Sequence, residues 1–406
     1  MENNTPLKRT LSLPQMVLYG LGTTIGAGIY ALVGELAGVS GYLAPAAFLF
    51  AAILAGMTAL SFAELSGRYP RAAGAALYTQ EGFHSHGLAR VVGLLVITAG
   101  LVSSAALVNA FSGYLNEIIA LERETTIVLV TLLLIALAIY GIAESVFIAA
   151  LITLIEVGGL IWIIFVSQDA LTLLPEMTSE LIPSFNTVHI GLIFSGALLA
   201  FYAFIGFEDM VDVAEEVKDV KRTLPLAILF TLGITTVLYL AIMITAILSI
   251  PPDELAKSQA PLATLYSHHT GESATMISLI GMFAIINGAL IQIIMASRVL
   301  YGLSSRHQLP SVLSYVNPVT QTPVIATLIA GLAVMTLAII GRLSSLAEVT
   351  SFIMLMVFSL VNLALWRIKQ RDPAPENCII FPKWLPLIAF IVSSTFVFLN
   401  IADYLL

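Results

Sequence analysis

The stretch GLGTTIGAGIY, residues 20–30, carries four glycines within nine positions in the middle of an apolar run. That run, residues 12–34, is long enough to cross the hydrocarbon core of a bilayer as a helix, which takes roughly 20 residues. Glycine gives the backbone access to non-helical conformations at low steric cost. The sequence therefore predicts a membrane-spanning helix that is interrupted near its middle.

A second interrupted span is predicted five spans later, around FSGALLAFYAFIGFE, residues 194–208. Interrupted segments in equivalent positions of two halves are typical of inverted-repeat transporters. Unwound backbone frees N–H groups that can bind a carboxylate and C=O groups that can bind an ammonium, so a zwitterionic amino acid matches such a site. The alternative interpretation is that the glycines only permit close packing between helices.

The composition supports a membrane protein. The 406 residues are 59% hydrophobic and only 10% charged, and their mean hydropathy is +0.98. A single water-soluble domain could not bury that much apolar surface. The lone cysteine, Cys378, excludes an intrachain disulfide and a cysteine-based metal site. We interpret the first apolar run as a span and not as a cleaved leader.

Apolar runs of helical length occur eleven times along the chain, which predicts an all-α integral membrane protein with about 11 transmembrane helices and no soluble domain. The predicted spans are residues 12–34, 42–66, 91–117, 125–143, 146–167, 190–213, 225–249, 274–302, 323–341, 345–366 and 384–403. The mixed stretch 66–90 is predicted to be an interfacial helix and not a further span.

Lysine and arginine sort to one side of these predicted spans, and cytoplasmic loops retain positive charge. With the N-terminus inside, the bases on the cytoplasmic side are Lys8, Arg9, Arg68, Arg71, Arg90, Lys218, Lys221, Arg222, Arg298, Arg306, Arg367, Lys369, Arg371 and Lys383. Those outside are Arg123, Lys257 and Arg342. We therefore expect a multi-pass protein of the cytoplasmic membrane with a cytoplasmic N-terminus and, by parity, an external C-terminus.

Several motifs together resemble the amino acid, polyamine and organocation superfamily of transporters, and within it the bacterial amino acid permeases. They are GTTIGAGIY at 22–30, YAFIGFE at 202–208, AEEVKDVKRTLP at 214–225, AEL at 63–65, YPRAAG at 69–74, SR at 297–298 and YGLS at 301–304. The chain departs from the family pattern at Val220, where relatives often have proline, at Ala75 and Ala76, and in showing eleven spans where twelve are common.

The resemblance implies a five-plus-five inverted repeat of the bacterial leucine transporter fold, with discontinuous helices 1 and 6. The first repeat would be residues 12–167 and the second 190–366, with an additional helix at 384–403. By position, the residues implied to bind substrate are Thr24, Ile25, Ala27 and Gly28 at its carboxylate end and Tyr202, Ala203, Phe204 and Ile205 at its amino group. Tyr202 would also act as an aromatic gate, although packing between spans would explain this residue as well.

Ionisable groups inside a membrane are costly and are by default candidates for function. Glu156 lies in the middle of the fifth predicted span, where many members of the resembled family place a lysine that stands in for a sodium ion. A carboxylate there could load and release a proton, or could be permanently protonated and bonded to a helix carbonyl. Glu208, after the second break, could contact substrate or shuttle protons.

The eighth span offers only Asn287 at about the right height for a sodium ligand, so we favour proton coupling or exchange and expect no metal site. Asp209 and Asp212 are interpreted as ordinary solvated charge on the cytoplasmic half-helix. Glu64 lies near a span end, where we expect snorkelling or ion pairing.

The predicted function is secondary active transport of a neutral or cationic amino acid by alternating access. Expected partners are the amino acid or related amine, the lipid bilayer and, if transport is proton-coupled, protons, with no nucleic acid and no cofactor. An enzyme is excluded, since no HExxH or GxSxG motif is present and every histidine falls in a loop or at a span edge. A polyamine or organocation transporter and a non-transporting amino acid sensor remain open.

Overall fold

The protein is described by a computed structural model that covers residues 9–71, 74–141, 146–184, 186–305, 309–373, 375 and 378–405. Within these ranges the regular structure is helical, and the one isolated strand-like bridge joins Leu11 to Val217. The predicted all-α class is confirmed. Three parts of the sequence patterns, Lys8, Arg306 and residues 72–73, lie outside the described residues.

The helices that correspond in position to the predicted spans follow the predicted order. They are α1 (Leu13–Ser40), α2 (Ala44–Arg68), α4 (His86–Asn116), α5 (Arg123–Tyr140), α6 (Val146–Val166), α8 (Thr187–Tyr202), α9 (Val220–Ser249), α12 (Thr275–Ser305), α13 (Val324–Ile340), α14 (Leu343–Arg371) and α15 (Leu385–Leu405). The connecting elements are η1 (Gly41–Leu43), α3 (Gly74–Phe83), η2 (Gln168–Leu173), α7 (Leu174–Leu181), η3 (Phe207–Glu216), α10 (Pro252–Leu255), α11 (Pro261–Thr270) and η4 (Ser311–Ser314).

By length and composition, seven helical stretches of the described chain could each cross a membrane, or eight if the bent pair 150–166 and 168–181 forms one span. One of the seven is the 56-residue stretch Leu13–Arg68, which contains both α1 and α2. Two shorter apolar segments are Val324–Ile340, which is α13, and Leu385–Ile401, which lies within α15. The predicted number of eleven spans is therefore not confirmed and stays a prediction.

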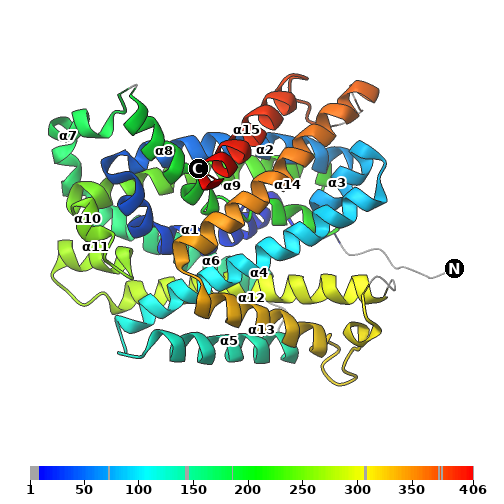
Figure 1. The fold of residues 1–406 in the computed structure, drawn as a ribbon, viewed down its shortest axis with the longest axis horizontal. Coiled ribbons are helices and arrows are strands. Elements are labelled where there is room, and N and C mark those ends of the chain that lie inside the picture. Colours follow the sequence, from blue (N-terminus) through cyan, green and yellow to red (C-terminus); the bar gives the residue numbers. More distant parts are fainter. Residues whose placement is uncertain are drawn as a thin grey trace.

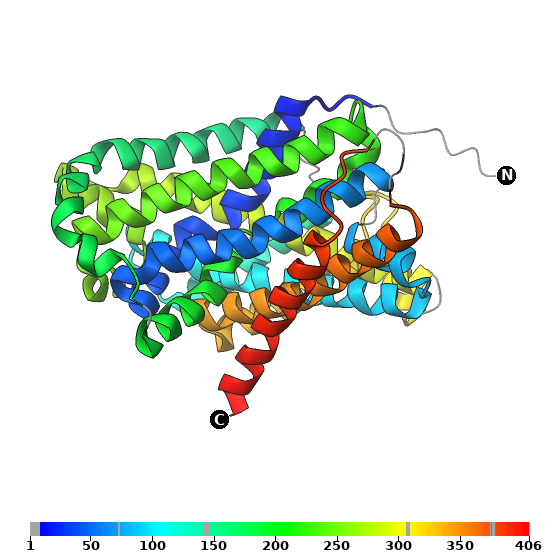
Figure 2. The same cartoon turned by 90° about the horizontal axis from the view of Figure 1, so that it is seen from above.

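Helices from the two halves of the chain pack against each other in matching pairs. α1 contacts α8, α2 contacts α9, α4 contacts α12, and α5 contacts α13, so each pair joins a span to the one five positions later. Figure 1 shows α4, α5, α12 and α13 side by side, with α14 packed along α4. In Figure 2, α15 runs obliquely across the outside of the bundle, where it contacts α2 and α14.

The first helix corrects one prediction, because α1 continues as a single α-helix from Leu13 to Ser40 and is not interrupted at residues 20–30. Its start is fixed by a capping box, in which Gln15 Oε1 accepts hydrogen bonds from Ser12 N (3.0 Å) and Ser12 Oγ (2.8 Å). Glycine permits a break without forcing one, and here the glycines let neighbouring side chains approach α1. Alanine at Gly22, for example, would place Cβ 2.3 Å from Thr153 Oγ1.

The connections are more ordered than the sequence predicted. α3 occupies part of the stretch 66–90 that was predicted to hold an interfacial helix. Helices α7, α10 and α11 were not predicted, since they are short and lie in stretches interpreted as loops. Polar contacts of His269 join α11 to α9 and η2. Its Nε2 lies 2.6 Å from Ser249 Oγ at the end of α9, and its Nδ1 lies 3.2 Å from Asp169 Oδ1 in η2.

Candidate functional site

The predicted interruption of the sixth span is present between α8 and η3. After α8 ends at Tyr202, the N–H groups of Ala203, Phe204 and Ile205 each bond to the carbonyl three residues back, at 3.0–3.1 Å. Gly206 then adopts φ +121°, a conformation that L side chains rarely take. Glu208 Oε2 accepts the freed N–H of Gly206 at 2.8 Å. The carboxylate therefore stabilises the break from within its own segment.

The α8–η3 turn lies directly against α1. The Thr23 hydroxyl donates to the carbonyl of Gly206 at 3.0 Å. A Cβ on Gly206 would lie 2.4 Å from Thr23 O, and a Cβ on Gly28 would lie 2.3 Å from the Cα of Ala203. Glycine is therefore required on both sides of this contact, because any side chain would collide with backbone.

Tyr239 of α9 joins the same two segments. Its buried hydroxyl lies 3.0 Å from the carbonyl oxygens of both Thr24 and Ala203, so its single proton is shared between α1 and the turn. The ring packs on Phe204 with a centroid distance of 5.3 Å. Tyr239 was not singled out from the sequence, because nothing in its local pattern shows that the carbonyls lie within reach.

Replacing Tyr239 with phenylalanine is expected to weaken this junction with little change in shape. The two carbonyls lose their shared donor, which costs on the order of 1–3 kcal/mol for a buried polar group left unpaired. Thermal unfolding of the purified variant measures the loss. Tyr140, which is 76% exposed, supplies a matched Tyr→Phe control that should leave the stability unchanged. Equal stability of the two variants would contradict the bridging role.

The residues implied to bind the carboxylate end of a substrate lie on α1 beside the turn. Thr24 and Ile25 are buried, and Thr24 Oγ1 has no hydrogen-bond partner among the described residues. Gly28 contacts Ala203 as described above. The backbone of Ala27 continues α1, but its side chain lies outside the described residues. Because α1 is continuous here, its N–H groups are not freed by an unwound segment.

The residues implied to bind the amino group are brought together by the turn. Tyr202, Ala203 and Phe204 are buried, and Ile205 is nearly so. The Tyr202 carbonyl accepts the N–H of Ile205 at 3.1 Å, which leaves one lone pair for another donor. The Tyr202 hydroxyl lies 2.9 Å from Ser103 Oγ of α4. The side chain predicted to be a gate is thus anchored to α4.

Glu156 and Asn287 lie on the other flank of α1. Glu156 is buried, and a Cβ on Gly26 would lie 4.0 Å from its Oε1, so its carboxylate faces α1 and not lipid. Its backbone carbonyl accepts the Tyr30 hydroxyl at 2.8 Å. Asn287 of α12 is also buried, and a Cβ on its neighbour Gly288 would lie 3.6 Å from Gly26 O. Both candidate coupling residues therefore lie near the glycine-rich part of α1.

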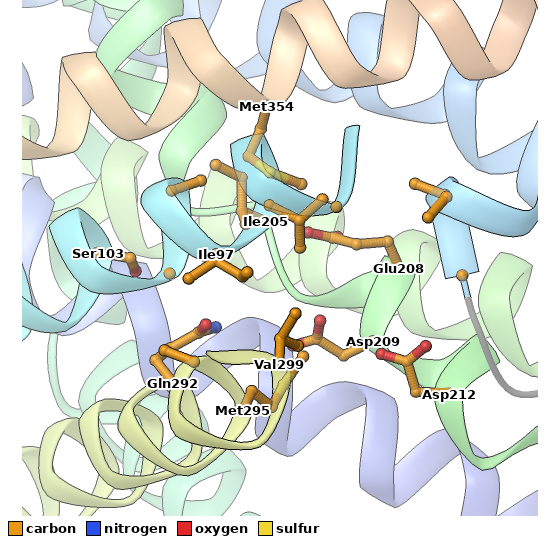
Figure 3. A pocket seen from close by; sticks show the side chains of 18 of the residues that line it. Ile97, Ser103, Ile205, Glu208, Asp209, Asp212, Gln292, Met295, Val299 and Met354 are labelled. Atoms are coloured by element: carbon orange, nitrogen blue, oxygen red, sulfur yellow. The ribbon is translucent and has the colours of Figure 1, made fainter. Parts of the chain in front are cut away.

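A cavity of about 380 Å³ ends at the α8–η3 turn. Its walls come from α3, α4, η3, α12 and α14, and Ser103 and Ile205 lie on its lining. Figure 3 shows Gln292 of α12 near Ser103 at one end of this space, and Asp209 and Asp212 of η3 toward the other end. Among the predicted site residues whose side chains the structure describes, Ile205 and Glu208 line it.

The cavity also corrects the interpretation of Asp209 as solvated charge, since only 9% of this residue is exposed. Asp212 is exposed, as expected, but it too lines the cavity. The three-residue spacing of Asp209 and Asp212 could have indicated that the two side chains share one face. This follows only if the segment is a 3₁₀-helix, in which residues i and i+3 lie one above the other.

Comparison with known proteins agrees with this architecture. The family model described as amino acid permease matches residues 11–402, which is nearly the whole chain. The chain belongs to the amino acid permease family. The resemblance seen in the sequence motifs is therefore confirmed, and this permease is a multi-pass membrane protein of a transporter family and not an enzyme.

Individual relatives carry transporter names. The permease is 29% identical to the vacuolar cationic amino acid transporter 2 of Arabidopsis thaliana over 90% of this chain and 61% of that protein. It is 26% identical to the branched-chain amino acid permease BcaP of Bacillus subtilis over 90% of this chain and 82% of that protein. The permease therefore spans about three fifths of the length of the plant transporter that it matches.

Proposed function

We propose that this permease is a secondary transporter that moves a neutral or cationic amino acid across the cytoplasmic membrane by alternating access. The observation that carries the proposal is the cavity that ends at the α8–η3 turn, where Ile205 and Ser103 line it. An amino acid at this end would meet the interruption between α8 and η3 and the helix α1 packed against it. The printed names of the relatives, cationic and branched-chain amino acid transporters, support this substrate class.

Alternating access is supported by the pairing of helices across the two halves. In this proposal residues 12–167 and 190–366 are the two inverted repeats, and 384–403 is an additional helix. The junction of α1 with the turn is tight and held by Thr23 and Tyr239, so movement of one repeat against the other would act directly on it. The residues proposed to bind substrate are Thr24, Ile25, Ala27 and Gly28 of α1 and Tyr202, Ala203, Phe204 and Ile205 of the α8–η3 turn.

The charge pattern supports a cytoplasmic N-terminus. The end of the molecule where α2 meets α3 would then be cytoplasmic, and the cavity, which α3 lines, would lie toward that side. Alternating access requires an inward-facing state in which a cavity connects the substrate site to the cytoplasm, and a cavity in this position would meet that requirement.

Uptake into proteoliposomes tests the function. Purified permease is reconstituted with a panel of labelled neutral and cationic amino acids and polyamines, under a proton gradient, a sodium gradient or neither, with and without unlabelled substrate inside. Saturable uptake of amino acids is expected, driven by the proton gradient or by internal substrate. Uptake of polyamines alone would change the substrate class, and binding without flux would favour a sensor.

For coupling, we propose that Glu156 carries the proton and that Glu208 and Asn287 also take part, with Asn287 on the same flank of α1 as Glu156 and Glu208 at the α8–η3 turn. Glu156 is buried against α1, in the region that must move if the substrate site is to open and close. Proton loading would remove the cost of holding a carboxylate in this apolar setting and so favour one conformation over the other.

Glu156→Gln is expected to reduce proton-driven accumulation to the level seen without a gradient, while exchange and substrate binding are retained. Glutamine keeps the shape of the side chain but cannot cycle a proton. Accumulation is measured at imposed pH gradients in proteoliposomes. Glu176→Gln, an exposed change on α7, is the control. A Glu156→Gln variant that still accumulates substrate in response to the pH gradient would rule out this role.

A further inference from the structure

The cavity beside η3 is strongly acidic. Glu208, Asp209 and Asp212 all contribute to its lining, and no lysine, arginine or histidine is among the lining residues of the described chain. Gln292, which is neutral, lies toward the Ser103 end of the cavity (Figure 3). The three carboxylates thus face a space in which the described residues offer no positive partner.

The three carboxylates are not equivalent. Glu208 is engaged in the turn, since it accepts the N–H of Gly206. Asp209 is about nine-tenths buried, lines the cavity, and within the described residues its carboxylate forms no hydrogen bond or ion pair. Burying a carboxylate without a partner is costly. Asp209 is therefore a buried acceptor that lacks a donor and points into a space large enough for a ligand.

The helix type aligns Asp209 with Asp212. η3 is a 3₁₀-helix from Phe207 to Glu216, with 3.0 residues per turn, so side chains three residues apart lie on the same face. Both aspartates line the same cavity, in agreement with this geometry. They can therefore approach a single cationic group from successive turns of the helix.

We propose that Asp209 and Asp212 form a subsite for the ammonium or guanidinium group of a cationic amino acid whose α-carbon end lies at the α8–η3 turn. Asp209 follows Gly206 by three residues, which is about 6 Å along a 3₁₀-helix. An extended lysine side chain reaches about 6 Å from its Cα to its Nζ, over five bonds of ordinary length. The subsite therefore lies where the end of a long basic side chain would be.

This inference rests on the proposed transport function and assigns these residues a part in selectivity. A guanidinium presents five N–H donors in a planar fork and can bond two carboxylates at once. Neutral amino acids of similar size would fit the space and leave Asp209 unpaired.

Arginine and citrulline separate charge from shape, because citrulline replaces the guanidinium with a neutral urea group. We expect the wild-type permease to bind and take up L-arginine in preference to L-citrulline. Asp209→Asn should lower the affinity for arginine by roughly tenfold to a hundredfold, since a charge-assisted hydrogen bond is lost, and should change that for citrulline by less than about threefold. Asp212→Asn should act in the same direction with a smaller effect.

Asp219→Asn is the matched control, because it removes one negative charge from the segment after η3 without touching the cavity. Ligand-induced thermal stabilisation in detergent, measured with L-arginine, L-lysine and L-citrulline, shows whether each variant is folded and binds. An arginine-to-citrulline ratio that is the same in wild type and Asp209→Asn overturns the subsite. If wild type takes up neutral amino acids but neither binds nor moves arginine, the subsite is wrong and the transport function stands. If no amino acid is bound or taken up, the transport function itself is wrong.

Discussion

Replacing Gly28 with alanine is expected to abolish amino acid uptake and to lower stability. The added Cβ would lie 2.3 Å from the Cα and 2.7 Å from the Cβ of Ala203, well inside contact distance. Relief would require α1 to move away from the α8–η3 turn, because the nearest atoms belong to backbone. Overpacking of this kind typically costs about 1–3 kcal/mol, which corresponds to a loss of roughly tenfold or more in affinity if the junction forms the substrate site.

Gly233→Ala provides the control for this prediction. Gly233 lies inside α9, and a Cβ there would meet nothing within 4 Å. Alanine at this position should be neutral or slightly stabilising, since it favours the helix over glycine by about 1 kcal/mol. Uptake and thermal stability are measured for both variants. Wild-type behaviour of Gly28→Ala would show that α1 and the turn can separate freely, and would contradict the tight junction described above.

The sequence predicted the order of the long apolar helices because bilayer thickness imposes a minimum apolar length on each span, although the number of spans is not confirmed. The break in the sixth span was also predictable, since Gly206 sits in a local sequence that a helix does not favour, and the structure gives it φ +121°. The break in the first span was not observed, although its glycines are denser. Glycine content alone cannot separate an interruption from a packing surface, because both use the missing side chain.

The candidate site was predictable only in part. The residues of α1 and of the turn lie together, as the motifs implied, and Tyr239 and Ser103 join them from spans that carry no signature. Asp209 was misread because its exposure depends on how α1, α2, α3 and α9 pack against η3. Such long-range contacts leave no trace in a local pattern of charge.

The partner of Glu64 could not be predicted from the local sequence either, because it is Lys369, which lies 305 residues away in the chain. The carboxylate is fully buried and accepts hydrogen bonds from Lys369 Nζ at 2.6 and 2.8 Å, from Arg68 at 2.7 and 3.0 Å, and from the N–H of Phe381 at 3.0 Å. The expectation of pairing near a span end is correct. The cluster joins the ends of α2 and α14 to the segment that precedes α15.

Glu64→Gln is expected to be among the most destabilising single changes in the permease. It would leave the Lys369 ammonium and the Arg68 guanidinium, both almost fully buried, without their shared carboxylate. Breaking a buried pair by removing one partner typically costs about 3–5 kcal/mol, because the remaining charge stays desolvated. A large drop in the thermal unfolding temperature of the purified protein should report this loss.

The exposed pair Arg123–Glu124 tests whether burial is the cause. Its charged atoms lie 3.4 Å apart, but the two side chains are 39% and 63% exposed, so Glu124→Gln should cost at most about 1 kcal/mol. In addition, Lys369→Met in the Glu64→Gln background should cost less than it does alone, because the lysine no longer has its carboxylate partner to lose. If the two changes have additive effects on stability, Glu64 and Lys369 stabilise the fold independently. The ion cluster would then not hold α14 and the start of α15 against α2.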